Sequence, residues 1–292
     1  MKQNLTTWVK SPKRAVSISR DERMVIIGER INPTGRKVLQ EELRRGDFDR
    51  VRRDAVSQLE AGADILDVNA GVPGMDQPKL LVEMIRAVRE ATADEAVICI
   101  DTADRASLEA ALNHYCGEGG KPLVNSVSAE SKRMREVLPL VKDYGAAVIG
   151  LASGDGGIPK TAEQRLENAS RIIEEATKLG IPVEDVVIDP VVLTLGVDWR
   201  SGKEVLGAIS MIVEQFGVNI TMGASNVSFG MADRPHLTAF FLAMCAVVGL
   251  SCPICNPLER ETRIALQAAD LVLARDEYGA RWIEGFRTRT AQ

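Results

Sequence analysis

The sequence predicts one α/β domain folded as a closed (β/α)₈ TIM barrel, and three observations favour this fold. Short runs of Val, Ile, Leu and Ala alternate with longer amphipathic stretches eight times in about 250 residues, the usual span of such a barrel. The apolar runs are continuous, as in parallel strands that are covered on both faces. No linker rich in Pro, Gly or Ser interrupts the series. The principal alternative is an open, doubly wound sheet.

Eight strand–helix units follow one another along the chain. The expected strands lie at residues 24–28, 65–69, 96–101, 123–125, 146–151 and 186–190, at the start of 220–228, and at 253–256. The expected helices lie at residues 47–61, 77–93, 105–115, 130–144, 162–179, 203–216, 235–248 and 260–275. Residues 1–23 are polar and basic, and we expect them to form an N-terminal extension outside a barrel domain of residues 24–292.

Composition argues against several classes of partner. The net charge is −5 and no long basic run is present, so we expect neither nucleic acid nor an anionic membrane as a partner. The first residues lack the apolar core of a signal peptide, and no apolar run reaches the ~20 residues of a membrane span. The five cysteines are unpatterned and are best explained as reduced, buried thiols. We therefore expect a soluble cytoplasmic protein.

Polar side chains stand at the ends of nearly all the expected strands. They are Glu29 and Asn32, Asp67 and Asn69, Asp101, Asn125, Asp189, Ser225 and Asn226, and Asn256. In a barrel these ends meet at one rim, the face where active sites of this fold lie. A single Asp could simply cap the next helix. Six or more together favour a ligand with several N–H groups, because clustered carboxylates at a partly dry rim are unfavourable unless donors meet them.

These residue types favour a flat heterocycle as the ligand. A carboxylate can accept two parallel hydrogen bonds from a guanidine-like edge. An amide such as Asn125 supplies one donor and one acceptor to the remaining edge. A pterin has this pattern. In the segment 220–228, Gly223 and Ser225 allow close approach of a ligand and Asn226 offers an amide, although an ordinary turn would explain the segment in isolation.

Other motifs carry less weight. With only two histidines, His114 and His236, a His-based zinc site is not expected, and we expect no metal. Cys252 and Cys255 have redox spacing but lie in an expected strand, not at a helix start. The helix around residues 240–248 is apolar on all sides, which suggests a dimer interface.

Seven short motifs occur in a recognisable order. They are Ile27-Gly28-Glu29-Arg30-Ile31-Asn32, Leu66-Asp67-Val68-Asn69, Ile100-Asp101-Thr102, Val124-Asn125-Ser126, Gly157-Ile158-Pro159-Lys160, Ile188-Asp189-Pro190 and Ser225-Asn226-Val227-Ser228. Together they resemble the pterin-binding methyltransferases that move a methyl group between methyltetrahydrofolate and a corrinoid protein. They also resemble the folate-binding region of cobalamin-dependent methionine synthase. The resemblance begins near residue 24 and reaches the last expected helix.

The resemblance implies a barrel, usually a homodimer, with methyltetrahydrofolate or tetrahydrofolate as substrate and a corrinoid (cobalamin) carried by a partner protein. It places the pterin ring on one group of residues and its reacting side on another. The ring residues are Asp101, Asn125 and Asp189, the reacting side is lined by Gly223, Ser225 and Asn226, and Arg234 matches a further position. Glu29, Asn32, Asp67 and Asn69 are secondary candidates. Phe229 departs from the pattern, since relatives can carry a polar residue there.

The chemistry of this reaction singles out Asn226. A methyl group on a tertiary amine is a poor electrophile, because its leaving group would be an unstabilised amide anion. Protonation of the folate N5 makes the leaving group a neutral amine, so the enzyme must favour the N5–H⁺ character of the transition state. The amide oxygen of Asn226 can accept that hydrogen bond without titrating. The cobalt supplies the nucleophile or, in reverse, the methyl donor, so no protein nucleophile is needed.

Both directions of methyl transfer use the same site, by microscopic reversibility. One role consistent with the residues is the tetrahydrofolate-methylating component of an O-demethylase system. Two alternatives remain open. One is a pterin enzyme like dihydropteroate synthase, although Met222-Gly223-Ala224-Ser225-Asn226 replaces the Lys and Ser-Arg signatures of that family. The other is a non-catalytic folate-binding module.

Overall fold

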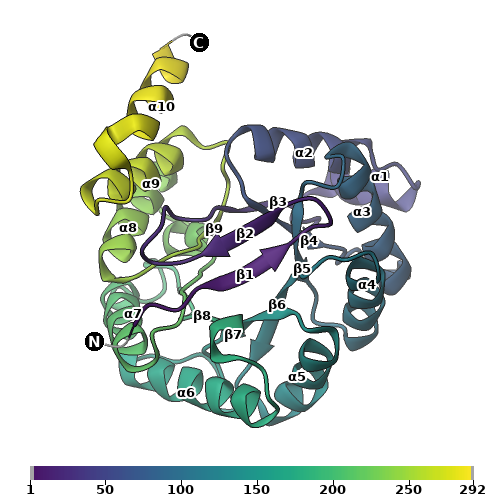
Figure 1. Cartoon of the computed structure of the whole chain (residues 1–292), viewed down its shortest axis with the longest axis horizontal. Coiled ribbons are helices and arrows are strands. Elements are labelled where there is room, and N and C mark those ends of the chain that lie inside the picture. Colours follow the sequence, from purple (N-terminus) through teal and green to yellow (C-terminus); the bar gives the residue numbers. More distant parts are fainter. Residues whose placement is uncertain (1–2, 291–292) are drawn as a thin grey trace.

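The computed structural model describes residues 3–290, and its centre is a parallel sheet curled into a barrel (Figure 1). Strands hydrogen-bond in the order β8-β7-β6-β5-β4-β3-β9. Their bounds are β3 Ile27–Ile31, β4 Ile65–Asn69, β5 Val97–Asp101, β6 Leu123–Ser128, β7 Ala147–Leu151, β8 Val186–Asp189 and β9 Ile254–Cys255. Residues 219–223 lie between β8 and β9 and close the ring. The Ile188 N–H donates to Asn219 O and the Ile254 N–H donates to Met222 O, both at 2.9 Å. The predicted single-domain barrel is confirmed.

Helices cover the outside of the barrel (Figure 1). Their bounds are α2 Asp49–Glu60, α3 Gln77–Ala91, α4 Arg105–Gly117, α5 Ser131–Tyr144, α6 Ala162–Lys178, α7 Ser201–Phe216, α8 Arg234–Val248 and α9 Arg260–Val272. Two helices are absent from the sequence prediction, α1 Lys37–Arg44 and α10 Ala280–Thr290. Short 3₁₀ helices span Val183–Asp185, Ala224–Ser228 and Glu277–Gly279. Within residues 3–290, no helix is long and apolar enough to cross a membrane.

Local sequence explains where several helices begin and end. The Asp76 carboxylate accepts a hydrogen bond from the Lys79 N–H at 3.2 Å and so caps the N-terminus of α3. At the start of α6, Thr161 and Gln164 form a reciprocal capping box. Helix α5 ends at Gly145, which has a φ of 62° and closes the helix in the left-handed conformation. These caps fix one end of each of the helices that follow β4, β6 and β7.

The first strand lies further along the chain than the sequence predicts. It spans Ile27–Ile31 rather than residues 24–28. A register shift between Gly28 and Ile31 lets pairing with β4 resume at Ile31 and Val68. Glu29 therefore lies inside the strand, and the expectation that it follows the strand is wrong. Polar residues at the shift look like a strand end in the sequence because the apolar run stops there.

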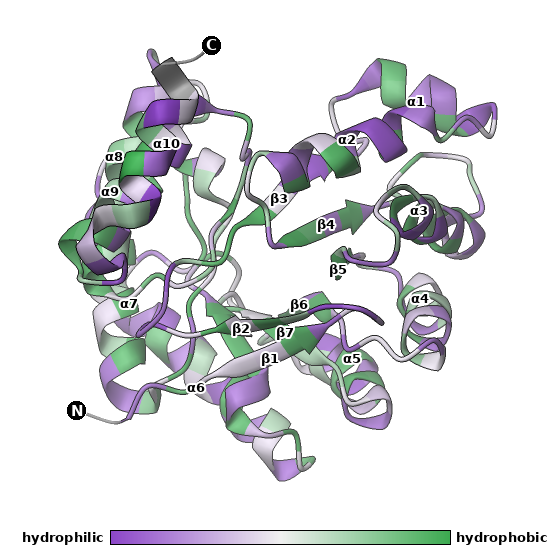
Figure 2. Ribbon diagram, turned by 45° about the horizontal axis from the view of Figure 1, so that its top comes forward, coloured by the Kyte–Doolittle hydropathy of each residue, from purple (hydrophilic) through white to green (hydrophobic). Residues whose placement is uncertain are grey.

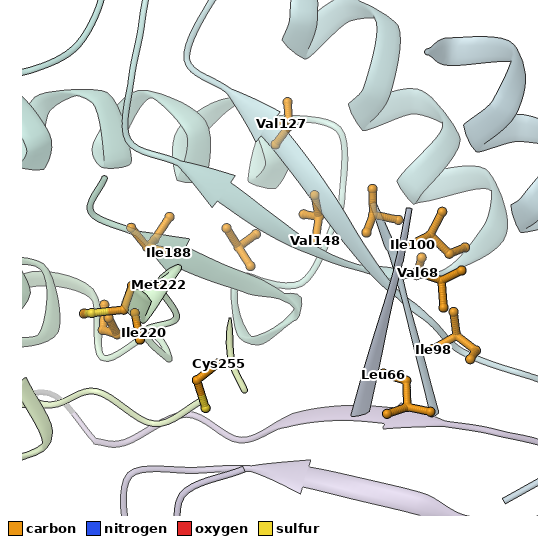
Figure 3. Close-up of a cluster of buried hydrophobic side chains, with 14 of the residues drawn as sticks. Leu66, Val68, Ile98, Ile100, Val127, Val148, Ile188, Ile220, Met222 and Cys255 are labelled. Carbon is orange, nitrogen blue, oxygen red and sulfur yellow. The ribbon is translucent and has the colours of Figure 1, made fainter. Parts of the chain in front are cut away.

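Alternation along the strands divides the core into two layers. Ile98 and Ile100 of β5 point outward and pack with the helices, in the cluster that Figure 3 shows. Val97 and Cys99 of β5 point inward and belong to the cluster that fills the barrel. The same alternation turns Asp101, two residues after Cys99, toward the interior at the carboxyl end of the strand. In Figure 2 the strands of the parallel sheet are mostly green, the colour of hydrophobic residues, whereas the surrounding helices carry both green and purple residues.

An antiparallel hairpin covers the amino end of the barrel. Its strands are β1 Thr7–Lys10 and β2 Ala15–Ile18. Val9, Val16 and Ile18 belong to the interior cluster. The Asn219 amide holds the hairpin by donating to Thr7 Oγ1 at 3.0 Å and to Ile18 O at 2.8 Å. The N-terminal hairpin thus lies outside the ring of parallel strands but completes its hydrophobic filling.

Candidate active site

A layer of acids and amides lies above the apolar filling, at the carboxyl ends of β4, β5, β6 and β8. The parallel register places Asn69, Asp101 and Asn125 next to one another on β4, β5 and β6. The Asn69 Nδ2 donates to Asp101 Oδ2 at 3.0 Å, and the Asn125 Nδ2 donates to Asp67 Oδ1 at 3.1 Å. Asp189 closes the layer from β8. The strands therefore bring these residues together at one rim, where the sequence predicts them to lie.

The carboxyl groups of this layer are buried with few donors. Burial raises the pKa of Asp189 from 3.8 to about 6, against the opposing effect of hydrogen bonds from the Val191 and Gly223 N–H groups. Burial, followed by the charge of Asp101, raises the pKa of Asp67 well above its ordinary value. Burial also raises the pKa of Asp101, and hydrogen bonds from Asn69 and Asp67 oppose that rise. Two hydrogen-bond donors at each of these carboxyl groups leave lone pairs that a ligand could still use.

Glu29 reaches the same rim from the irregular part of β3. Gly28 leaves room beside it for the Gln58 amide, because a Cβ at position 28 would lie 2.5 Å from Gln58 Oε1 and would displace it. That oxygen accepts the Arg30 N–H at 2.9 Å and so satisfies the backbone at the register shift. The Ser225 hydroxyl donates to Glu29 Oε2 at 3.5 Å. Burial, then the Glu259 carboxylate, raises the pKa of Glu29 to about 7.

The segment 223–228 forms the opposite wall, where the chain turns from strand into a 3₁₀ helix. Asn226 is exposed on this helix, and its amide lies over Gly223, where a Cβ would meet Asn226 Nδ2 at 2.9 Å. Arg234 donates from Nη2 to Ser225 O at 3.2 Å and lies over the Phe229 ring at 5.6 Å. Arg234 thus supports the loop, and its guanidinium stacks on the exposed side chain of Phe229.

Not every predicted site residue has atoms free for a ligand. The Asn32 Oδ1 accepts the Thr34 N–H at 2.9 Å, in a local turn. Asn69 donates to Asp101 and accepts the Gly71 N–H at 2.7 Å, so it holds neighbouring groups. Asp67 is only 3% exposed and lies beneath the rim. Asp101, Asn125, Asp189, Gly223, Ser225 and Glu29 border the rim directly.

Sequence reasoning overlooked two features of the site. Arg165, on α6, is fully buried and donates to Pro190 O at 2.7 Å and Val191 O at 3.2 Å, which fixes the loop after Asp189. A charged residue on an amphipathic helix gives no signal for such a role. A cavity of about 450 Å³ also opens beside Asp101, between the loops after β4 and β5. It is lined by Asn69, Ala70, Gly71, Gln77, Asp101, Thr102, Ala103, Asp104 and Ser107.

A larger cavity, of about 630 Å³, lies away from the rim between α2, α9 and α10. Its two buried aspartates are already paired: Asp64 binds Arg14 and Arg23, and Asp270 binds Arg281. Cys252 and Cys255 are buried free thiols, and burial raises the pKa of each, so neither is a reactive thiolate at neutral pH. The rim is therefore the better candidate for the active site, because its polar groups lack partners of opposite charge.

Comparison with known sequences finds relatives along most of the chain. The chain is 32% identical over 270 residues to the methylcorrinoid:tetrahydrofolate methyltransferase of Eubacterium limosum, covering 90% of this chain and 96% of that protein. It is 31% identical over 259 residues to the methionine synthase of Mycobacterium tuberculosis. That match covers 84% of this chain but 21% of the synthase, so the chain corresponds to about a fifth of it.

Solved structures share the barrel. Dihydropteroate synthase of Xanthomonas albilineans in complex with 7,8-dihydropteroate aligns with a TM-score of 0.68 at 17% identity, over 91% of this chain and 99% of that one. The enzyme of Thermus thermophilus aligns with a TM-score of 0.66 at 18% identity, over 91% and 99%. At these identities the likeness shows the fold alone. The sequence model for pterin binding enzymes matches residues 28–256, and the chain therefore belongs to the family of pterin-binding enzymes.

Proposed function

We propose that this protein is a methyltransferase that moves a methyl group between N5 of tetrahydrofolate and the cobalt of a corrinoid protein. The observation that carries the proposal is the layer of buried carboxyl groups beside the Gly223–Asn226 wall, in a chain similar along 90% of its length to a methylcorrinoid:tetrahydrofolate methyltransferase. The pterin meets the carboxyl layer and the methyl group lies against the wall.

Pterin binding supplies the donors that the layer lacks. Asp101 and Asp189 each have acceptor capacity facing the rim, and a guanidine-like edge offers the amine and ring N–H groups that match it. Asn125 forms hydrogen bonds with the adjoining edge of the ring. Burial raises the pKa of Asp189 to about 6. At neutral pH this carboxyl is therefore mostly ionised, but its charged form is less stable than it would be in water. A bound N–H donor relieves that situation and so contributes to affinity.

Asn226 is placed to assist the chemistry rather than to hold the ring. Its amide lies above Gly223, next to Ser225, which contacts Glu29. An amide oxygen there can accept a hydrogen bond from N5 as that nitrogen gains N–H⁺ character. The corrinoid supplies the nucleophilic or methyl-bearing cobalt. No protein nucleophile takes part.

The corrinoid must approach this wall from outside, and the adjoining surface suits a protein partner. Exposed apolar side chains gather on the loop after β8 and on the loop after residue 223: Val197, Trp199, Phe229 and Met231. The two loops are joined, since the Leu195 N–H donates to Val227 O at 3.0 Å. We call these four residues the rim patch. Exposed aromatic groups are typical of binding surfaces, so the rim patch is the proposed contact for the corrinoid protein.

A homodimer is proposed through α8. Phe240, Met244 and Val247 are 68%, 50% and 68% exposed along one face of this helix. A stripe of large apolar side chains on a helix is normally covered. A second copy of the chain would cover it by two-fold symmetry, as in the family that the sequence resembles.

The decisive experiment mixes the protein with methyltetrahydrofolate and cob(I)alamin and follows the absorbance change to methylcobalamin. Methyl transfer supports the proposal, and the reverse assay with methylcobalamin and tetrahydrofolate tests the direction in which the Eubacterium limosum relative is named. Folate binding without transfer in either direction would contradict the proposal and favour a binding module. Absence of both would contradict the pterin site itself.

A further inference from the structure

We infer that Asp67 is a positioning residue that keeps a proton at neutral pH and thereby sets the hydrogen-bonding roles of Asp101 and Asn125. The inference rests on the proposed pterin ligand for its functional meaning, although the proton itself can be tested without any ligand. Asp67 is not among the groups that border the rim. It acts on them from one layer below.

Asp67 sits where three strands bring polar groups together. It projects inward from β4, opposite Cys99 of β5 in the parallel register, and is 3% exposed. The Asn125 Nδ2, from β6, donates to its Oδ1 at 3.1 Å. Asp101 and Cys99, both from β5, hydrogen-bond with it as well. Each of its neighbours therefore comes from a strand, whose position the barrel fixes.

The charges around this cluster require a shared proton. The titratable groups that act on Asp67 are Asp101 and Cys99 from β5 and Glu29 from β3, and none of them is a cation. Two buried carboxylates in contact cannot both ionise at low cost. Asp67 is the more deeply buried of the pair, and Asp101 faces the rim and receives the Asn69 amide. The proton therefore resides on Asp67, which donates it to Asp101.

This proton orders the atoms that a ligand meets. With Oδ1 of Asp67 accepting from the Asn125 Nδ2, the Asn125 Oδ1 remains for the ligand as an acceptor, beside the second N–H of the amide. Asp101 stays ionised because it receives two hydrogen bonds, from Asn69 and from Asp67. Both groups then present acceptors, and the site selects a ring edge rich in N–H donors. A ring that presents a carbonyl oxygen to Asp101 would bind more weakly, since an acceptor would face an acceptor.

A conservative variant distinguishes a protonated Asp67 that positions its neighbours from an Asp67 that contacts the ligand itself or acts through a negative charge. Asp67→Asn reproduces the neutral acid, because its amide can donate to Asp101 and its oxygen can accept from Asn125. We expect Asp67→Asn to bind methyltetrahydrofolate within about threefold of the wild type, and Asp67→Ala to lose at least about tenfold, in calorimetric titrations. Asp101→Asn is the matched control and should lose binding strongly. A loss in Asp67→Asn equal to that in Asp101→Asn would overturn the inference.

A ligand-free measurement tests the proton directly. In infrared spectra with ¹³C-labelled aspartate, the apoprotein should show the carbonyl band of a protonated acid at about pH 8.5, above the pKa values of Asp189 (about 6) and Glu29 (about 7). The band should vanish in Asp67→Asn. Its absence from the wild type would overturn the inference. If the wild type binds no folate, the proposed function fails, while this band still decides whether the pair of Asp67 and Asp101 holds a proton.

Discussion

The Asp189→Asn substitution should weaken pterin binding and should make the folded protein more stable relative to wild type as pH rises. The reason is that Asp189 is a buried acid whose charge costs stability and serves the ligand. Burial raises its pKa from 3.8 to about 6 in the folded protein. A raised carboxyl pKa contributes stability that is fully present below the unfolded value and is lost as pH rises through the folded value. The unfolding free energy of the wild type should thus fall between about pH 4 and pH 7 as Asp189 ionises. The amide variant lacks this ionisation and should not show that contribution to the fall.

The size of the effect follows from the two pKa values. The gap between 3.8 and about 6 corresponds to about 3 kcal/mol, most of it falling between pH 4 and pH 7. The unfolding free energy of Asp189→Asn relative to wild type should therefore rise by ~2–3 kcal/mol over that range. Any fixed loss from the Gly223 N–H, which would face an amide, cancels in this difference. Urea unfolding at several pH values measures it.

The same variant should bind methyltetrahydrofolate at least ~30-fold more weakly, because a charged acceptor becomes a donor that faces donors, at ~2 kcal/mol or more. Calorimetric titration at pH 7 provides this value. Two results would refute the reasoning: parallel stability profiles for the variant and the wild type, or unchanged folate affinity. The first would mean that Asp189 is not desolvated in the folded protein, and the second that it does not meet the pterin.

Three further substitutions test the proposed reaction and its partners. Asn226→Ala should reduce kcat at least ~100-fold with little change in folate Kd, by stopped-flow transfer and calorimetry; equal losses in both would rule out the N5 role. Trp199→Ser, in the rim patch, should raise KM for a corrinoid protein that the wild type methylates about fivefold or more, while transfer with free cob(I)alamin is unchanged. Met244→Glu places a charge within the exposed stripe of α8 and should give monomers in sedimentation velocity where the wild type is a dimer; a monomeric wild type would disprove this interface.

The sequence predicts the barrel and most of its rim because both depend on a single periodicity. Continuous apolar strands determine where each strand ends, and residues two apart on a strand share a face. Asp101 and Asn125 could therefore be placed at one rim from their spacing to the apolar run alone. The register that makes them neighbours then follows from parallel pairing on consecutive strands.

The features that the sequence hides depend on tertiary contacts. Glu29 enters the site through a register shift whose backbone is satisfied by Gln58, a residue on α2. The hairpin at the amino end is held by the Asn219 amide across about 200 residues of chain. Asp67 has the same strand-end pattern as Asp101, yet the register sets it opposite Cys99 and therefore below the rim instead of on it. A pattern of residue types cannot distinguish these depths.

Gly223 lies between Asp189, which is proposed to bind the ring, and Asn226, which is proposed to assist methyl transfer. A substitution at Gly223 can therefore test whether the two functions are separate. Its N–H donates to Asp189, and its α-carbon lies under the Asn226 amide, so that a Cβ would be 2.9 Å from Asn226 Nδ2. The φ of Gly223 is −71°, which alanine adopts without strain. Gly223→Ala should therefore leave the hydrogen bond to Asp189 intact and displace only the amide.

We expect Gly223→Ala to lower kcat for methyl transfer by about tenfold or more while folate Kd stays within about twofold, because a displacement of the Asn226 amide removes a contact made in the transition state. Gly156→Ala is the matched control, since its added Cβ would meet no atom within 4 Å. It should leave both constants unchanged. A variant at Gly223 that weakened folate binding and turnover equally would mean that the Asn226 wall also holds the ring, and that binding and chemistry are not separated in this site.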